Sequence, residues 1–523
     1  MKILFSLQNS GFLRNFNSTV ALLAQRGHRV HIVTDRMDNV GGTHIVSSLT
    51  STYPSVTFEV VRPPRRGLWV ALTNVLRLSI DYWRYLEPKF AQAAQLRGRA
   101  KEQVPGLMVA LPTLPGLNST AGRRWLMRVA RAAERAIPPR PQVFDLLDRE
   151  QPDLVLLTPL LYFGSRQVDF VRAARRRGIP TVLGVGSWDH LTTKGLIHEI
   201  PDRLVVWNEM QRVEATELHG VDPSHVIVTG AQAYDHWFER RVSTTREQFC
   251  GRVGLPADRP YLLYLCSSPF ITPHEVPFVR RWIEAIRAAD DPRVRSLGLL
   301  IRPHPQNAEQ WKDVDLSVYP DVSIWPRAGA NPVDADARAE YFDSMFHSHA
   351  VVGVNTSALI ESGIVGRRVY SLVAQEFSGT QEGTLHFQHL KNVEGGLLRL
   401  ASTLDEHVAQ IAPTLGVMAE GDDLKVRGFV QAFVRPHGLD VVATERVVAV
   451  IEATAASRPA PVGEPAGAPL ARLLLAPLAF VVMLAAFDEK DWQAVRDGVR
   501  GRFTRSAPAK SKARKPRDKK ASA

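Results

Sequence analysis

Short apolar segments that alternate with helical patterns constrain the fold of this chain more than any other feature. In the first part of the sequence they lie at 2–7, 29–35, 153–159, 180–186 and 203–208. Helical periodicity occurs between several of them, as in "NSTVALLAQRGH" and "VDFVRAARRRG". Strands that alternate with helices form a mostly parallel sheet with helices on both faces. The sequence therefore predicts an α/β fold.

A second series of the same kind follows "AYDHWFERRVST". Its apolar segments lie at 260–266, 297–303, 322–326, 350–355 and 367–372. With 523 residues, of which 45% are hydrophobic, the chain is also too long for one ordinary core. We therefore predict two Rossmann-like lobes, residues 1–237 and residues 238–455, that face a cleft.

Four further segments stand outside this pattern. Residues 63–141 interrupt the first lobe with helical, Arg-dotted sequence such as "RRWLMRVARAAERA", which predicts a helical insertion. Residues 456–470 are rich in Pro, Ala and Gly and predict a linker. Residues 471–500 begin with an apolar run, and residues 501–523 form a basic tail.

The net charge of +12 is concentrated in that tail. It contains nine Lys or Arg and one Asp, which gives +8 and leaves only +4 for the preceding 500 residues. Such a segment has little to bury against the entropy of ordering, so we expect it to be disordered. It is either a solubilising terminus or a ligand for anionic lipid headgroups. The absence of interleaved aromatic residues argues against nucleic acid as a partner.

The apolar run from Leu473 to Phe487 has fifteen residues with Pro477 near its centre. This is shorter than the roughly 20 residues that span a bilayer, although extension back through "APLAR" makes a marginal candidate, so a span is an alternative that is not favoured. We expect a monotopic hairpin or an interfacial helix backed by the basic tail, with packing against the protein as the alternative. Cys250 and Cys266 indicate neither a disulfide framework nor a zinc site, and the N-terminus reads as a core strand. The expected location is cytoplasmic, peripheral or monotopic at the inner face of the plasma membrane.

Two polar turns follow apolar strands of the second series. In "LGLLIRPHPQN" the strand ends at Arg302, and His304 lies between two prolines. In "HAVVGVNTSALIES" the strand gives way to Asn355, Thr356 and Ser357 before a helix. Asn, Thr and Ser cap helices, and uncommitted N–H groups at such a turn bind anions, of which phosphate is the natural one. The alternative is a plain turn whose hydroxyl groups only cap the helix. Open α/β folds bind ligands at the carboxyl ends of strands, where both turns lie.

These segments resemble a known group of enzymes. "RPHP" followed by "NTSALIESGIVGRRVY" resembles the His-Pro and Ser/Thr motifs of GT-B transferases with phosphate-linked donors. The resemblance is to the CDP-glycerol glycerophosphotransferase family and to bacterial sialyl- and Kdo-transferases. In the first lobe, "GVGSWDHLTTKG" and the order of segments up to "VTGAQAYD" resemble the glycerophosphotransferase pattern. Together they cover roughly residues 1–450 and imply a GT-B-like fold.

The resemblance also implies roles for residues in the second lobe. His304 would contact the donor phosphate or assist departure of the leaving group, with Arg302 nearby. The residues expected to hold the phosphate are Asn355, Thr356 and Ser357, and Glu361 would reach a ribose or sugar hydroxyl. Protein donors can stabilise charge on a departing phosphate, so we expect no metal and no separate cofactor; the nucleotide-activated donor is a substrate.

Further candidates lie in both lobes. Asp189 and His190 follow a first-lobe strand, and either is a candidate base for an acceptor hydroxyl, although Asp189 alternatively only caps the next turn. Gly11 and Arg14 are expected on the acceptor side, as is the insertion, unless it lies at a membrane surface. In the second lobe, Ser267 and Ser268 follow a strand and are expected to meet the donor phosphate, and Glu382 is expected to contact the sugar or ribose of the donor. His386 is a weaker candidate that is alternatively packed.

The leading hypothesis is a transferase of glycosyl or glycerophosphate groups in surface glycan or lipid-linked polymer assembly. Its expected partners are a nucleotide-linked donor, a glycan or lipid-linked acceptor and an anionic membrane surface. One alternative is a UDP-GlcNAc 2-epimerase-like enzyme, although "NTSALIES" lacks the Gly-Gly phosphate turn expected there. The other is a non-catalytic nucleotide-binding scaffold attached to membranes.

Overall fold

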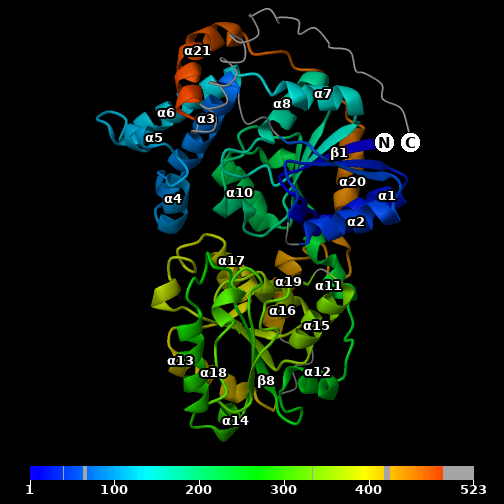
Figure 1. Ribbon diagram of the computed structural model, residues 1–523, viewed down its shortest axis with the longest axis vertical. Helices are drawn as coiled ribbons and strands as arrows, with labels where there is room; N and C mark the ends of the chain where they lie inside the picture. Colours follow the sequence, from blue (N-terminus) through cyan, green and yellow to red (C-terminus); the bar gives the residue numbers. More distant parts are fainter. Residues whose placement is uncertain (39–40, 63–66, 333, 417–423, 487–523) are drawn as a thin grey trace, which may run out of the picture.

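The computed structural model describes the chain except residues 39–40, 63–66, 333, 417–423 and 487–523 (Figure 1). The predicted basic tail and the last part of the predicted apolar segment thus lie outside the described residues. Two α/β lobes are stacked along the long axis of the molecule (Figure 1). Each contains one parallel sheet, so the α/β fold with two lobes is confirmed.

Lobe 1 contains a seven-stranded parallel sheet in the order β3-β2-β1-β4-β5-β6-β7. Its strands are β1 (Lys2–Leu7), β2 (Arg29–Thr34), β3 (Val56–Val60), β4 (Leu154–Thr158), β5 (Thr181–Gly184), β6 (Arg203–Val206) and β7 (Val226–Val228). Chain order reverses between the neighbours β1 and β4, which makes the loops after these strands a site where α/β folds bind ligands. The loop with Arg14 follows β1.

Lobe 2 contains a six-stranded parallel sheet in the order β10-β9-β8-β11-β12-β13. Its strands are β8 (Tyr261–Leu265), β9 (Gly298–Arg302), β10 (Val322–Ile324), β11 (Ala350–Gly353), β12 (Arg368–Leu372) and β13 (Leu398–Ala401). Strands β9 and β11 flank β8, so the turns that follow them lie on either side of the loop after β8. All predicted strands of both series occur, and except in β10 most of their residues are buried.

Helices cover both faces of each sheet. In lobe 1 and its insertion they are α1 (Asn17–Gln25), α2 (Gly42–Thr52), α3 (Leu68–Arg84), α4 (Ala94–Lys101), α5 (Gly106–Ala110), α6 (Thr120–Ala136), α7 (Pro141–Glu150), α8 (Val168–Arg177), α9 (His190–Thr193) and α10 (Glu209–His219). Helix α11 (Asp235–Glu239) lies at the crossing to lobe 2. The rest are α12 (Arg246–Val253), α13 (Val276–Arg287), α14 (Pro292–Arg295), α15 (Ala335–Phe346), α16 (Ala358–Ile364), α17 (Phe387–Asn392), α18 (Leu404–Ile411), α19 (Leu424–Phe433), α20 (Ala443–Ala455) and α21 (Ala468–Ala485).

Helix α20 corrects the predicted boundary between the lobes. The sequence assigned residues up to 455 to lobe 2, but α20 packs on the sheet of lobe 1 beside α1 (Figure 1). Val447 and Ile451, one helical turn apart, lie buried in the same core cluster as strand β1. These residues form an apolar stripe that packs on the sheet of lobe 1. The sequence does not predict this packing, because the helix follows the strands of lobe 2 in the chain. The chain therefore crosses between the lobes twice.

A buried carboxylate holds the two crossings together. The Asp235 side chain accepts hydrogen bonds from the Arg435 guanidinium at 2.8 Å, from the Ala443 N–H at 3.1 Å, and from the Thr444 N–H and hydroxyl at 2.7 Å each. Asp235 and Arg435 are 4% and 5% exposed. A buried ion pair needs this number of partners to offset its desolvation. The contacts fix α20 against the first crossing.

The helical insertion is fastened to lobe 1 by buried arginines. In α3, Arg77 bonds Glu134 of α6 and Asp169 of α8, both at 2.8 Å. Farther along α3, the Arg84 guanidinium donates to the carbonyl groups of Leu191 and Gly195 at 3.1 and 2.7 Å. The insertion thereby holds the loop after β5.

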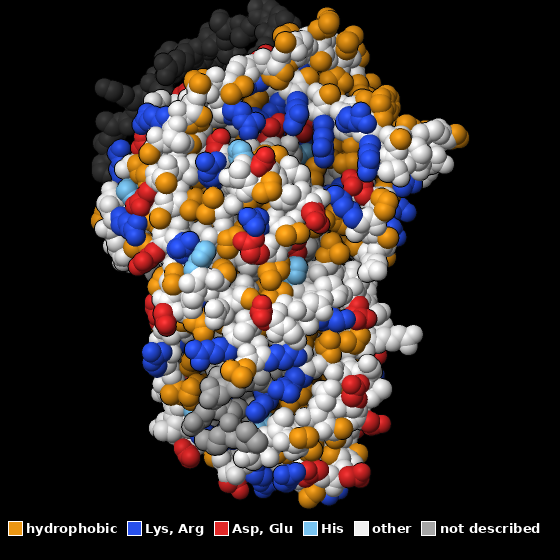
Figure 2. Space-filling view, turned by 180° about the vertical axis from the view of Figure 1, so that it is seen from behind, with side chains coloured by type: hydrophobic (Ala, Val, Ile, Leu, Met, Phe, Trp, Pro, Cys, Tyr) orange, Lys and Arg blue, Asp and Glu red, His pale blue; other side chains and the backbone are white. Residues whose placement is uncertain are grey.

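Seen from behind, apolar side chains gather at the end of the molecule that carries α21 and the insertion (Figure 2).

Replacement of Asp235 tests the crossing. The variant Asp235→Ala leaves the Arg435 guanidinium buried without its counter-ion, so we expect the stability to fall by about 3–5 kcal/mol. Calorimetric melting of the purified protein measures the loss as a lower Tm. Glu445→Ala, at an exposed position of α20, is the matched control. A Tm for Asp235→Ala equal to that of the control would contradict the assignment.

Candidate active site

The two polar turns of lobe 2 are tied together by Ser267, in the loop after β8. The Asn307 side-chain amide donates to the Ser267 carbonyl group at 3.1 Å, and the Asn355 N–H donates to the Ser267 hydroxyl at 3.4 Å. The two turns lie two strand spacings apart, which is about 10 Å. Ser267 is fully buried. It therefore joins the turns as a structural residue and offers no hydroxyl to a ligand.

The His304 imidazole is a neutral hydrogen-bond donor. Its Nδ1 accepts a hydrogen bond from the Gln306 N–H at 3.1 Å, so in the neutral ring the proton is on Nε2. Burial, with a smaller contribution from the nearby Arg14 charge, lowers the pKa of His304 to about 4. At neutral pH the ring is uncharged. The half-buried His304 ring can therefore donate a hydrogen bond from its Nε2–H.

Arg302 lies elsewhere than the sequence predicted. Its guanidinium pairs with Glu340 at 3.2 Å and lies 4.9 Å from the centroid of the Tyr341 ring. The residue is 5% exposed. Arg302 is the last residue of β9, and side chains alternate across a strand, so this one packs within lobe 2 instead of extending the His-Pro turn.

The three residues of the second turn have different environments. Asn355 is buried, and its side-chain amide donates to the Thr380 carbonyl group at 2.7 Å. Thr356 is half-buried, and its hydroxyl accepts weakly from the Ala358 N–H at 3.4 Å. Ser357 is exposed and makes no side-chain capping bond to α16. Thr356 and Ser357 are therefore the ones whose hydroxyl groups can reach a ligand.

Glu361, on α16, is a half-buried carboxyl group. Its Oε2 accepts a hydrogen bond from the Tyr341 hydroxyl at 2.6 Å. Burial raises the pKa of Glu361, and this effect is opposed by the Tyr341 bond and by the charges of Arg14 and Arg240. The carboxyl group is fixed by one oxygen and lies within electrostatic reach of lobe 1.

Arg14 is the cation of lobe 1 that faces these groups. It lies in a short 3-10 helix, Ser10–Asn15, after β1, and is exposed. Its charge acts on His304 and Glu361 in lobe 2 and on His190 in lobe 1. Within the described part of the chain, Arg14 makes no hydrogen bond or ion pair. The interlobe space therefore contains a positive charge that has no ion pair with any residue the structure describes.

Gly11, in the same loop, has a packing role. A Cβ atom at this position would clash with the carboxylate of Asp38. The Gly11 N–H donates to the Asn9 side chain at 3.0 Å. The absent side chain thus lets the loop close against Asp38, which in turn places Arg14 at the carboxyl edge of the sheet.

The Asp189 carboxylate organises the loop after β5. It accepts hydrogen bonds from the Ser187 hydroxyl at 2.5 Å and the Thr193 hydroxyl at 3.0 Å. Although burial opposes ionisation, the charges of Lys194, His190 and His386 hold the pKa of Asp189 well below its ordinary value. A carboxylate that is this acidic and this well bonded is a weak base.

His190 is the more suitable proton acceptor of the pair. Burial lowers its pKa to about 4, and the neighbouring Asp189 charge opposes that shift. The ring is 4% exposed, and its Nδ1 has no hydrogen-bond partner among the described residues. It packs edge-on against Phe12 with the ring centroids 5.9 Å apart.

Two residues of this region were not among the predicted site residues. Lys194 is half-buried, its Nζ lies 5.8 Å from the Tyr162 ring centroid, and it has no ion pair in the segments that the structure covers. Tyr234 is buried at the interlobe crossing, where burial first, and then the charges of Glu361 and Asp189, raise its pKa well above the ordinary value. They lie in "TTKG" and "AYD", two of the segments that carry the sequence resemblance.

The loop before and within α17 joins the two lobes. His386 packs edge-on against Trp188 with the centroids 4.7 Å apart, and its Nδ1 lies 3.4 Å from the Thr192 hydroxyl. His389 Nε2 and the Glu214 carboxylate lie 2.5 Å apart. His386 is thus packed at the interface, in line with the alternative interpretation of this residue.

Glu382 and Ser268 contribute less to this site than the sequence predicted. Glu382 is exposed and pairs with Lys391 at 2.6 Å. Ser268 is half-buried, and its carbonyl group accepts from the N–H groups of Ile271 and Thr272. Surface pairing and turn formation account for these two residues without a ligand.

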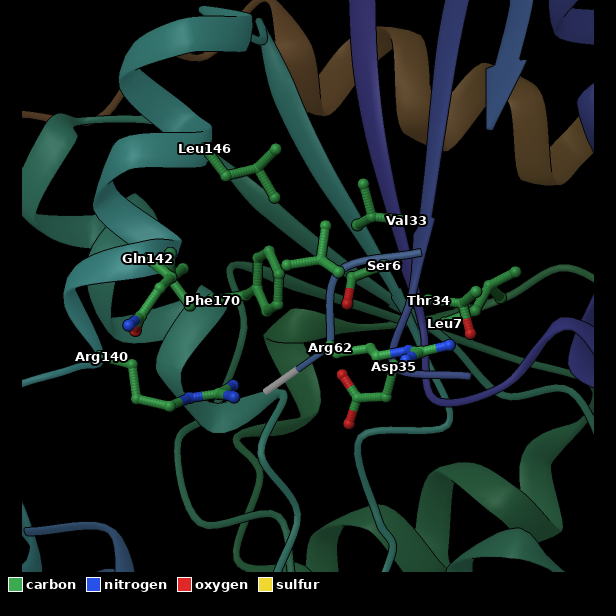
Figure 3. Close-up of a pocket in the computed structure, with 12 residues that line it drawn as sticks. Ser6, Leu7, Val33, Thr34, Asp35, Arg62, Arg140, Gln142, Leu146 and Phe170 are labelled. Atoms are coloured by element: carbon green, nitrogen blue, oxygen red, sulfur yellow. The ribbon is translucent and has the colours of Figure 1, made fainter. Parts of the chain in front are cut away.

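A small hollow, with room for about one water molecule, lies at the carboxyl edge of the lobe 1 sheet (Figure 3). Asp35 and Arg62 line it opposite Arg140, and Val33, Leu146 and Phe170 form its apolar wall (Figure 3). Burial raises the pKa of Asp35. Arg140 also bonds Asp169 at 2.6 Å. The hollow combines an apolar wall with both signs of charge, which suits a hydroxyl-bearing group.

One set of potential metal ligands occurs among the described residues: His31, Glu59 and Glu150. Arg149 pairs with both glutamates, and Lys2 pairs with Glu150 at 2.7 Å. These cations already balance the carboxylates. The set lies within β2, β3 and α7, apart from the polar turns of lobe 2.

The electrostatic effect of Arg14 on His304 can be measured. Arg14→Gln removes a positive charge that disfavours the imidazolium, so we expect the pKa of His304 to rise from about 4. NMR titration of the histidine ring signals follows this shift. Arg29→Gln, at an exposed position at the amino end of β2, is the control and should leave the titration unchanged. An unchanged His304 pKa in Arg14→Gln would show that the Arg14 charge does not act on His304.

The interlobe histidine makes stability depend on pH. The pKa of His386 is lowered from 6.5 to about 4, so between these values the unfolded chain binds the proton and the folded chain does not. Stability is therefore lost as the pH falls through this range, by about 1.4 kcal/mol per pH unit. His386→Gln should show a shallower decline of Tm between pH 7 and pH 4. Parallel Tm curves for wild type and variant would refute the buried neutral ring.

No protein-family model matches this sequence, and no curated protein matches it. Solved structures align over most of its length. The UDP-GlcNAc 2-epimerase from Methanocaldococcus jannaschii aligns with 11% identity and a TM-score of 0.49, over 87% of this chain and 100% of that chain. The UDP-GlcNAc 2-epimerase from Neisseria meningitidis bound to UDP-GlcNAc aligns with 12% identity and a TM-score of 0.48, over 87% and 100%.

A glycosyltransferase from Rickettsia africae aligns with 12% identity and a TM-score of 0.48, over 87% of this chain and 98% of that chain. These neighbours have two different kinds of activity on related architectures. A fold hosts many functions, so the likeness assigns no reaction to this chain. The GT-B-like arrangement described above rests on this chain's own strand order and on the return of α20 to lobe 1.

Proposed function

We propose that this protein is a GT-B-type transferase that takes a group from a nucleotide-activated donor, whose phosphates bind between the lobes. The observation that carries the proposal is the position of Arg14. This unpaired cation of lobe 1 acts electrostatically on His304 and Glu361 of lobe 2. Both lobes thus contribute polar groups to one interlobe site.

The charges of the site favour an anion. Arg14 and Lys194 make no ion pair in the described chain, although the Lys194 charge lowers the pKa of Asp189, and Lys194 is half-buried. Partial burial of a cation without a partner costs free energy, and such groups gather at functional sites. A bound phosphate group would form ion pairs with these two cations. It would also accept a hydrogen bond from the His304 Nε2–H.

The same groups suit the transfer step. When an acceptor hydroxyl attacks the transferred group, the bond to the donor phosphate breaks, and its electron pair remains on the phosphate oxygen. Arg14, Lys194 and His304 would stabilise that charge from fixed positions. The proton of the attacking hydroxyl would pass to His190, where the adjacent Asp189 carboxylate stabilises the imidazolium.

Other groups would position the two substrates. Glu361, held by Tyr341, would accept hydrogen bonds from ribose or sugar hydroxyl groups, and Thr356 and Ser357 would donate to the phosphate. For the acceptor, we assign the carboxyl edge of lobe 1 around Asp35 and Arg140. A glycan or lipid-linked acceptor in the cytoplasm, as used in the assembly of surface polymers, presents hydroxyl groups of this kind.

A nucleotide screen tests donor binding. CDP, UDP, GDP and CMP are added separately and the Tm is recorded. A ligand that binds only the folded state stabilises it by about 2.7 kcal/mol at 100 times its Kd. We expect one nucleotide to raise the Tm of the wild type and of Arg29→Gln but to raise that of Arg14→Gln much less. Equal stabilisation of all three proteins would contradict a phosphate site at Arg14.

Release of free nucleotide from matching activated donors tests the reaction. His304→Ala should lower kcat/KM at least about 100-fold with an unchanged Tm, because it removes a donor to the developing charge. Wild-type activity in His304→Ala would remove its proposed role. A product that is the 2-epimer of the donor sugar, or tight binding without turnover, would overturn the transferase in favour of an epimerase or a scaffold.

A further inference from the structure

Helix α21 packs one of its faces on the helical insertion of lobe 1. Ala479 is buried in a small cluster with Leu72 of α3 and Ile137, and Leu475 and Val482 pack against it. Arg472, near the start of the helix, pairs with Glu464 of the preceding segment at 2.5 Å. The apolar segment is therefore attached to the folded body along its length (Figure 1).

The opposite face of α21 is apolar and exposed. Leu470, Leu473, Leu474, Leu478 and Val481 are 64%, 71%, 73%, 48% and 61% exposed. Their spacing of three, four, eight and eleven residues places them on one stripe of the helix. No charged side chain of α21 lies on that stripe, because Arg472 is its only charged residue. Contiguous apolar surface of this kind marks an interaction site.

Helix α6, which neighbours α21, also exposes apolar and cationic side chains. It contacts α21, and its outward face presents Trp125 and Val129, which are 54% and 45% exposed. The exposed Arg124 and Arg128 alternate with them one helical turn apart. Figure 2 shows apolar side chains at this end of the molecule and a row of Lys and Arg beside them.

We propose that this face, formed by the exposed stripe of α21 and the outward face of α6, docks on an anionic lipid bilayer. The alternation of Trp with Arg at the border of an apolar stripe matches the boundary between acyl chains and negative headgroups. The basic segment 501–523, which follows α21 in sequence, adds a charge of +8 of the same sign.

The packing of α21 also sets its orientation on the bilayer. By length and composition, α21 is the one described helix that qualifies as a membrane span. A spanning helix would have to expose to lipid the face that holds Ala479 against α3, and to break the pair of Arg472 with Glu464. The helix instead lies parallel to the surface, with its stripe inserted and lobe 1 attached. This inference does not depend on the reaction proposed above.

Vesicle co-sedimentation of the full-length protein tests the docking surface. The vesicles contain phosphatidylcholine alone, or phosphatidylcholine with phosphatidylglycerol. We expect the wild type to bind the anionic vesicles at least tenfold more tightly. The double variant Leu473→Asp/Leu474→Asp should bind both kinds at least tenfold more weakly, and Arg124→Glu/Arg128→Glu should lose the preference for anionic lipid.

Two control proteins separate the surface of α21 and α6 from lobe 2 and from the basic tail. Val318→Asp changes a residue of lobe 2 that is 75% exposed and should bind vesicles as the wild type does. A full-length variant with the nine Lys and Arg of 501–523 replaced by Gln should still lose binding on Leu473→Asp/Leu474→Asp. Because the replaced residues are exposed, these variants should have the same Tm as the wild type. They should also release nucleotide in solution at the wild-type rate.

Three outcomes would overturn the proposal. The first is vesicle binding of Leu473→Asp/Leu474→Asp equal to the wild type. The second is sedimentation of the wild type as a dimer that this variant converts to a monomer without lipid, which would assign the stripe to a second copy of the chain. The third is resistance of the membrane-bound protein to alkaline carbonate extraction, which would indicate a spanning helix.

Discussion

The structure depends on the way parallel strands direct their carboxyl ends to one edge of a sheet. In this protein two such edges face each other. The charge of Arg14, after β1, accordingly affects the pKa values of His304, after β9, and of Glu361, on α16. Each lobe alone would expose an incomplete set of polar groups. The double crossing, fixed by Asp235, keeps the two edges opposed. The site is thus a property of the pair of lobes.

Charge in the site is distributed unevenly. Asp189 is ionised and fully bonded, while His190, His304 and His386 are kept neutral by burial. Arg14 and Lys194 make no ion pair among the described residues. A site with neutral donors and unpaired cations is arranged for an incoming anion, since a protein counter-ion would compete with it.

Helix α3 links the two surfaces to which we assign functions. Its apolar side carries α21, and its C-terminal turn places Arg84 against the carbonyl groups of the loop that contains Lys194. Tyr85, next in sequence, donates to the Lys194 carbonyl group at 2.7 Å. The insertion therefore positions a loop of the site and supports the proposed lipid-facing helix through one rigid element.

The sequence by itself determined the two series of strands, the lobes and the two polar turns, because apolar segments, Pro and capping residues act locally. It missed the short strands β3, β7 and β13, whose residues are partly exposed, as in the pattern of Val56–Val60. Only the tertiary structure decided that Arg302 pairs with Glu340, that α20 returns to lobe 1 and that Arg14 faces lobe 2. Those outcomes depend on which helices, strands and side chains pack together although they are far apart in sequence. Local sequence patterns do not determine such packing.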